Sequence, residues 1–203
     1  MSSLAGVERL ILARHAETEW NVRKLVNGDP AAAVVLTEQG REEAQRLGEE
    51  LAGEPIELCV VTPFGRTAET AELALAGRDV PRLVLAELGD PRYGSFEGGS
   101  LELYREWAWS KPSSTAPPGG GEARATIVER YARAFRRLLA LEQEVVLAVC
   151  HSLPVAYAIA GRDGDAPAPK VPLVQNAHPY RFTRAEVERV AELLEGWCAS
   201  PSW

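Results

Sequence analysis

The sequence is poor in the residues that build disulfide frameworks and zinc sites. Its 203 residues include three histidines and three cysteines, Cys59, Cys150 and Cys198. The number of cysteines is odd, and no two of them have CxxC spacing. Disulfide scaffolds and structural zinc sites both need closely placed thiols, so this pattern indicates reduced cysteines and predicts a cytoplasmic protein.

Long apolar runs and an excess of basic residues are also lacking. No stretch approaches the roughly 18–20 apolar residues that a membrane-spanning helix needs. The N-terminal residues MSSLAGVERL show no charged segment followed by a long apolar one, as a signal peptide would. The net charge is −7 and no Lys/Arg block occurs. We therefore expect neither nucleic acid nor a membrane as partner, although a local cationic pocket is compatible with this charge.

The sequence does contain alternating apolar runs and amphipathic segments, with 46% hydrophobic residues overall. Strands are predicted at 7–13, 56–61, 82–88 and 144–150, and helices at 36–51, 66–75, 123–142, 153–161 and 187–197. This order predicts an α/β fold: a three-layer sandwich with a mostly parallel central sheet and helices on both faces, in one domain over 1–203. The Trp-rich and then Pro/Ser/Gly-rich stretch at about 95–125 predicts a lid-like insertion.

Reactive side chains follow the predicted strands directly. In chain order they are Arg14, His15, Arg66, Asp90 and His151. Ligands of such folds bind beyond the carboxyl ends of the strands, so we expect these side chains to meet at one edge of the sheet. Two of the three histidines in the chain are part of this set.

This set of residue types suits phosphoryl transfer. A neutral imidazole can attack phosphorus, guanidinium groups bind phosphate oxygens in a bidentate manner, and a carboxylic acid can protonate the leaving oxygen. A metal is not expected, because arginines would repel a divalent cation and no HxH, HExxH or CxxC spacing appears. No other cofactor is implied.

Six segments resemble motifs of the histidine phosphatase superfamily, which includes cofactor-dependent phosphoglycerate mutases and many small phosphatases. They occur in family order between about residues 9 and 155: LILARHAETEWN, LTEQGREEAQRLG, VVTPFGRTAETA, DPRYGSFEG, PPGGGEA and VVLAVCHS. The resemblance implies that His15 is the nucleophile that forms a phosphohistidine, and that Asp90 is the general acid. It also implies that the phosphoryl group is surrounded by Arg14, Arg66 and His151. The expected substrate side comprises Thr18, Asn21, Tyr93 and Ser152, with Asn21 near the nucleophile.

The sequence departs from the family pattern at several positions. Ala16 stands where the family has Gly, and its methyl group could crowd the phosphate. Asp90 stands where many members carry Glu, and Glu87 is the alternative acid if the loop shifts its register. The 27–36 link is longer than usual. Trp107 and Trp109 are expected to serve packing, and His178 is expected to be structural or exposed.

The sequence thus predicts a metal-independent phosphatase that hydrolyses a small phosphorylated metabolite. Two alternatives remain: a phosphomutase of the phosphoglycerate mutase type, and a non-catalytic relative that binds a phosphorylated ligand. The lysine that follows the acid loop in mutases has no counterpart in GGSLELYREW. The sequence leaves open whether the chain forms a homo-oligomer. We further expect positive charge from Arg14 and Arg66 to lower the pKa of His15.

Overall fold

A computed structural model describes residues 6–172 and 174–203, so residues 1–5 of the N-terminal stretch considered above lie outside it. The described chain forms a five-stranded sheet with the order β3-β2-β4-β1-β5. The strands are β1 (Arg9–Arg14), β2 (Leu58–Val61), β3 (Arg82–Val84), β4 (Val145–Cys150) and β5 (Tyr180–Thr183). The first four run parallel, whereas β5 is antiparallel to β1. The predicted mostly parallel α/β sheet is confirmed.

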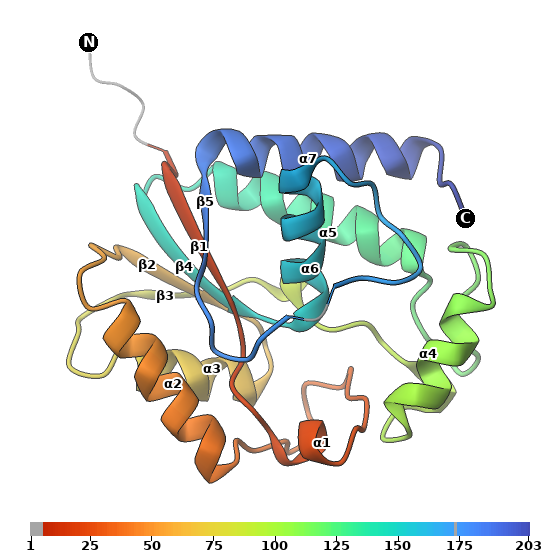
Figure 1. The fold of residues 1–203 in the computed structure, drawn as a ribbon, viewed down its shortest axis with the longest axis horizontal. Coiled ribbons are helices and arrows are strands. Elements are labelled where there is room, and N and C mark those ends of the chain that lie inside the picture. The colour runs from red at the N-terminus through yellow and green to blue at the C-terminus, as the bar shows by residue number, and fades with distance from the viewer. Residues whose placement is uncertain (1–5, 173) are drawn as a thin grey trace.

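Helices cover both faces of this sheet. They are α1 (Glu19–Val22), α2 (Glu38–Glu50), α3 (Gly65–Ala74), α4 (Leu101–Trp109), α5 (Arg124–Leu139), α6 (Ser152–Asp163) and α7 (Arg184–Ala199). Figure 1 shows α2 and α3 below the sheet and α5, α6 and α7 above it, which is the expected three-layer arrangement. Among the described residues, no helix has the length and apolar character needed to cross a membrane.

The alternation of side chains along β4 explains why the molecule has two apolar clusters. Val146, Ala148 and Cys150 belong to the cluster shared with α5, α6 and α7. Val145, Leu147 and Val149 belong to the cluster shared with α2 and α3. All of β4 is buried, as a continuous apolar run in a parallel sheet should be. Cys150 is a free thiol in the core, and burial raises its pKa to about 12.

Three local features differ from the sequence-based expectations. The strand β5 was not predicted, because only Phe182 of its four residues is buried and the strand lies at the sheet edge. The third strand ends at Val84 and is followed by a 3-10 turn, Ala86–Leu88. The helix expected to end at Gly161 continues to Asp163. Gly161 is retained inside it because α7 passes so close that a Cβ atom there would lie 3.2 Å from Val190 Cα.

The connections that leave β1 and β4 determine where the site lies. These two strands are neighbours at the centre of the sheet. The chain after β1 leads to α2 on one face, whereas the chain after β4 leads to α6 on the other (Figure 1). A crevice forms at the carboxyl ends of neighbouring parallel strands whose connections diverge in this way. Arg14, His15 and His151 lie at that place.

Candidate active site

The surroundings of His15 define which ring nitrogen carries the proton. Nδ1 lies 2.8 Å from the carbonyl oxygen of Ala16, and Nε2 lies 3.1 Å from Nε of Arg66. A carbonyl oxygen can only accept a hydrogen bond and a guanidinium can only donate one. The proton therefore resides on Nδ1, and Nε2 presents a lone pair toward Arg66.

The charge state of His15 follows from its burial. The side chain is 3% exposed, and this burial is the largest cause that holds its pKa well below the usual range. The positive charges of Arg66 and Arg14 lower the pKa further. The predicted direction of the shift is confirmed, although burial contributes more than the neighbouring arginines. His15 is neutral at physiological pH, as a nucleophile must be.

Arg66, the second residue of α3, is held on several sides. Its Nη1 donates to Oδ1 of Asn27 at 2.7 Å, its Nη2 donates to Oδ2 of Asp90 at 2.7 Å, and its guanidinium lies over the ring of Phe64. With 4% of its surface exposed, the guanidinium is a pre-oriented charge. Asn27 does not stand out in the sequence, because it lies in the long 27–36 link and outside the family motifs. The turn dipeptide Asn27-Gly28 could have marked it.

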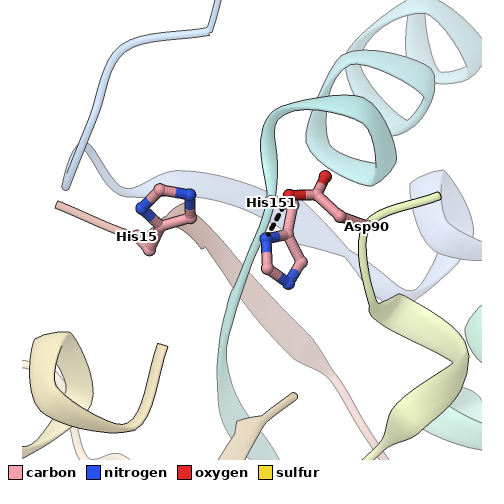
Figure 2. A group of neighbouring side chains, drawn as sticks. All are labelled: His15, Asp90 and His151. Carbon is pink, nitrogen blue, oxygen red and sulfur yellow. Dashed lines mark ion pairs between the residues drawn. The ribbon is translucent and has the colours of Figure 1, made fainter. Parts of the chain in front are cut away.

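Asp90 and His151 form the second half of the cluster. Figure 2 shows the ion pair between them, in which Oδ2 of Asp90 lies 3.0 Å from Nδ1 of His151. The hydroxyl of Thr62 bonds the other ring nitrogen at 3.0 Å. Burial by itself would raise the pKa of Asp90, but His151 and Arg66 outweigh it and hold this pKa below its usual range. Burial also lowers the pKa of His151, in part offset by Asp90.

The loop that carries Asp90 is held by α5. Arg130 donates from Nη1 to the carbonyl oxygens of Glu87 at 2.7 Å and Gly89 at 3.0 Å. The same guanidinium forms an ion pair with Glu122 at 2.8 Å, and both side chains of this pair are largely buried. Neither Arg130 nor Glu122 stood out in the sequence, because they serve the loop through its backbone and not through a recognisable motif.

Glu87, the alternative acid, points elsewhere. Its carboxylate pairs with Arg137 on the outer side of α5. It is absent from the wall of the cavity, whereas Asp90 is part of that wall. The geometry therefore favours Asp90 over Glu87 as the acid of this loop.

The residues singled out in the sequence meet at one cavity of about 330 Å³. Its wall includes eight of the nine: Arg14, His15, Thr18, Asn21, Arg66, Asp90, Tyr93 and Ser152. The ninth, His151, is fully buried and contacts Asp90. Trp107 packs against Phe96 and Tyr104, as expected. Trp109, by contrast, is 40% exposed and lines the cavity.

Asn21 has a structural task in addition to its place in the wall. Its Oδ1 accepts from the backbone N–H of Thr18 at 3.0 Å, and the Thr18 hydroxyl accepts from the backbone N–H of Asn21 at 3.2 Å. This reciprocal pair is a capping box that starts α1. The asparagine amide that contacts Arg66 belongs to Asn27, and another missed residue, Asn176, donates to the carbonyl oxygen of His15 at 2.8 Å.

The methyl group of Ala16 faces away from the cavity. Ala16 is fully buried and belongs to the apolar cluster between the sheet and α2 and α3. Its backbone N–H donates to the hydroxyl of Thr70 at 3.0 Å. Ala16 is not part of the cavity wall, so its methyl group does not narrow the space in which a phosphate would bind.

The cluster of His15, Asp90 and His151 fits a metal ion poorly. Ligand atoms of His15, Asp90 and His151 lie within 4.8 Å of one another, which by itself is a spacing that a cation could use. However, the Arg66 guanidinium contacts His15 at 3.1 Å and Asp90 at 2.7 Å. A divalent cation would meet this fixed positive charge, whereas an oxyanion would be attracted by it.

The match to known proteins agrees with this chemistry. Residues 10–195 match the family model of the histidine phosphatase superfamily, branch 1. The chain belongs to the histidine phosphatase superfamily. The resemblance found in the sequence is thereby confirmed.

Relatives within the superfamily include phosphatases and mutases. The chain is 34% identical over 161 residues to an adenosylcobalamin/alpha-ribazole phosphatase of Salmonella typhimurium, covering 75% of this chain and 78% of the relative. It is 29% identical over 171 residues to a 2,3-bisphosphoglycerate-dependent phosphoglycerate mutase of a Methylobacterium species, and the match covers 76% of this chain and 80% of the mutase. The crystal structure of the alpha-ribazole phosphatase from Shigella flexneri superposes with a TM-score of 0.73 at 28% identity, covering 85% and 89%. The likenesses to the two alpha-ribazole phosphatases support a phosphatase.

Proposed function

We propose that this histidine phosphatase superfamily member hydrolyses a small phosphate monoester through a phosphohistidine on His15, without a metal. The observation that carries the proposal is the state of His15: a buried, neutral imidazole with its Nε2 lone pair beside a fixed guanidinium. An imidazole in this state can attack phosphorus, while the guanidinium neutralises charge on the phosphoryl oxygens.

In the first step, Nε2 of His15 forms a bond to phosphorus and the bond from phosphorus to the ester oxygen breaks. The phosphoryl oxygens are bound by Arg66 and Arg14. Among the described residues, Nε of Arg14 is a buried donor without a hydrogen-bond partner, so it is available for such an oxygen. The ring of His15 becomes positively charged, and its Nδ1–H bond to Ala16 stabilises that charge and holds the ring orientation.

Asp90 supplies the proton to the leaving oxygen. In the free protein it is a carboxylate, since His151 and Arg66 hold its pKa down. A phosphoryl dianion draws the Arg66 guanidinium and the N–H of His151 away from Asp90 and adds negative charge beside it. Both changes raise the pKa of Asp90, so on substrate binding the carboxylate takes up from solvent the proton that it then passes to the leaving oxygen.

The spacing in the cluster supports such a displacement. A phosphorus atom ready for attack lies roughly 3–3.5 Å from the nucleophile, and the leaving oxygen needs a further hydrogen bond of about 2.6–3.2 Å to the acid. Ligand atoms of His15, Asp90 and His151 lie within 4.8 Å of one another, so a phosphoryl group beside His15 would also lie beside Asp90.

In the second step, the Asp90 carboxylate takes a proton from water. The water oxygen attacks phosphorus, the bond to Nε2 breaks, and inorganic phosphate leaves with His15 neutral again. A mutase would return the phosphoryl group to a second alcohol at this point. The similarity to a phosphoglycerate mutase supports this mutase reaction as the second candidate function.

A single experiment separates these outcomes. The protein is mixed with a ³²P-labelled aryl phosphate in the presence of EDTA, and samples are quenched in alkali, in which phosphohistidine survives. We expect transient labelling of the wild-type chain, release of inorganic phosphate, and neither event in His15→Ala. Complete loss of turnover with EDTA contradicts the metal-free mechanism. Labelling that transfers to added alcohol in preference to water favours the mutase, and absence of both label and phosphate release favours a non-catalytic relative.

A further inference from the structure

The cavity is strongly cationic in a protein that is acidic overall. The chain has 22 Lys and Arg against 29 Asp and Glu. Among the described residues that line the cavity, the only carboxylate is Asp90, whereas the cationic residues are Arg14, Arg66, Arg105, Arg124 and Lys170. Asp90 is already paired with Arg66 and His151. The cavity therefore has more positive charge than a single phosphoryl group requires.

Three of these cations lie outside the phosphate cluster: Arg105 on α4, Arg124 at the start of α5, and Lys170 in the segment after α6. Within the described chain, none of the three forms an ion pair with a carboxylate, although most other arginines elsewhere in that part of the chain do. A cation that faces a cavity without an acidic partner is available to an anionic ligand.

Arg124 is placed against the preference of its own helix. It is the first residue of α5, where the helix dipole disfavours a positive charge. Its Nη1 donates to the hydroxyl of Tyr157 at 3.1 Å, a neutral partner that orients the guanidinium without cancelling its charge. The electrostatic cost at the helix start is not recovered from any intramolecular ion pair in the described structure. A ligand anion would recover it.

The other two cations belong to different segments of the cavity wall, Arg105 to α4 and Lys170 to the segment after α6. Nζ of Lys170 lies 4.9 Å from the centre of the Trp109 ring, which joins the segment after α6 to α4 across the cavity. Arg105 is near enough to the cluster that its charge, after the larger effect of burial, contributes to a lowered pKa of Arg14. The three cations thus line the same cavity as the phosphate cluster.

The rest of the wall combines polar side chains such as Thr18, Asn21 and Ser152 with apolar ones. Trp20 and Trp109 provide indole rings, and Leu101, Leu153 and Val171 provide aliphatic surface. The volume of about 330 Å³ corresponds to on the order of ten water molecules at roughly 30 Å³ each, which exceeds what a phosphoryl group fills. A ligand of metabolite size fits, with an apolar body beyond the phosphate.

We infer that the alcohol portion of the substrate carries a second anionic group, a carboxylate or another phosphate, bound by Arg105, Arg124 and Lys170, on an apolar body that packs against Trp20 and Trp109. The inference rests on the proposed function, because that function places the reacting phosphoryl group at His15. It concerns the other end of the same ligand. The same three cations could bind a carboxylate or a phosphate, and the test below distinguishes these two groups.

The test compares esters that differ only in charge at the far end. The probes are 4-carboxybenzyl phosphate, its neutral 4-carboxamide analogue, and a benzyl phosphate with a 4-phosphonomethyl group. Their leaving alcohols are nearly equal, so kcat/KM differences report the outer contacts. We expect the charged esters to exceed the carboxamide on the order of tenfold, as for one charge-assisted contact. The charged ester with the higher kcat/KM, carboxylate or phosphonate, shows which anion the three cations bind better.

Substitutions then assign the preference to these residues. Arg124→Met, Arg105→Met and Lys170→Met should each reduce the charged-to-neutral ratio severalfold. The matched control is Arg133→Met on the same helix, where Arg133 is exposed and pairs with Glu129, and its ratio should equal that of the wild type. Arg105 and Lys170 are not buried, so their variants keep the test informative if Arg124→Met fails to fold.

Failure of this inference is distinguishable from failure of the proposed function. Hydrolysis of all three esters with a ratio near one overturns the inference and leaves the hydrolase intact. If no ester is hydrolysed, calorimetry with the non-hydrolysable 2-(4-carboxyphenyl)ethylphosphonate and its carboxamide decides. Tighter binding of the carboxylate that is lost in Arg105→Met and Lys170→Met supports the second anionic subsite, and equal binding of both phosphonates overturns it.

Discussion

The carboxylate of Asp90 lies 2.7 Å from Nη2 of Arg66, so that the two side chains form an ion pair in the wall of the cavity. In the proposed mechanism this guanidinium binds the phosphoryl group. Asp90 and phosphate consequently compete for one partner in the free protein. Removal of the Asp90 carboxylate should therefore change the affinity of the protein for phosphate.

Replacing the acid should strengthen the binding of the product anion. In Asp90→Asn no carboxylate competes for Arg66 and His151, so we expect inorganic phosphate to bind at least severalfold more tightly than to the wild type. Titration calorimetry at constant ionic strength measures the change. Glu87→Gln is the control, since Glu87 pairs with Arg137 outside the cavity. Weaker phosphate binding by Asp90→Asn would show that the carboxylate does not occupy the position of the anion.

The same variant should discriminate between leaving groups. An alkyl alcohol leaves only when it is protonated, whereas a nitrophenol leaves readily as the anion. We expect Asp90→Asn to lower kcat/KM, which reports cleavage of the ester bond and not the later attack of water, by about 10²–10⁴ for an alkyl ester, the usual range for general acid catalysis, and far less for an aryl ester. A Brønsted plot of kcat/KM against leaving-group pKa is the measurement. Equal losses on both esters would assign the proton to another group.

The buried neutral state of His15 makes stability depend on pH. Its folded pKa is well below the unfolded value of about 6.5, so below that pH the unfolded chain binds more protons. We expect the contribution of His15 to be present above about pH 6.5 and to decline as pH falls toward the folded pKa, by up to about 1.4 kcal/mol per pH unit. Urea unfolding at several pH values measures this.

His15→Gln supplies the comparison for that experiment, because it removes the titrating group and keeps a polar side chain. The free energy of unfolding of the variant should lose less between pH 7 and pH 5.5 than that of the wild type. Imidazole NMR signals give a direct view: the His15 signal, assigned by its absence in the variant, should remain in the neutral form at pH 6.5. A signal half shifted at that pH contradicts the assignment of His15 as a neutral nucleophile.

Arg130 should influence catalysis through the acid loop. In Arg130→Met the carbonyls of Glu87 and Gly89 lose their donor and the carboxylate of Glu122, 6% exposed, loses its cation. Breaking a buried pair by removing one partner costs roughly 3–5 kcal/mol, so the melting temperature should fall. We also expect kcat for an alkyl ester to fall, since Asp90 is no longer held in position.

A second variant separates these two effects. Arg130→Met combined with Glu122→Gln removes the unpaired buried charge and should recover part of the lost stability. It should not recover kcat, because the loop carbonyls still lack the guanidinium. Recovery of both quantities together would mean that Arg130 serves folding alone.

Much of the architecture follows from local patterns. The apolar run at 144–150 and the amphipathic pattern at 187–197 are short-range signals, and β4 and α7 form over them. The strand β5 gives no such signal. Its residues become a strand because the exposed edge of β1 offers hydrogen-bond partners, which is a property of the assembled sheet.

The sequence by itself determined the family, the α/β order and the reactive residues that follow the strands, because strand ends and motif spacing are written along the chain. Only the tertiary structure decided that the ring of His15 carries its proton on Nδ1, that Asp90 faces the cavity in preference to Glu87, and that Asn27 and Arg130 support the site. Protonation and orientation depend on burial and on partners from distant segments. Those distances exist only after the chain has folded, and the cations Arg105, Arg124 and Lys170 become one surface for the same reason.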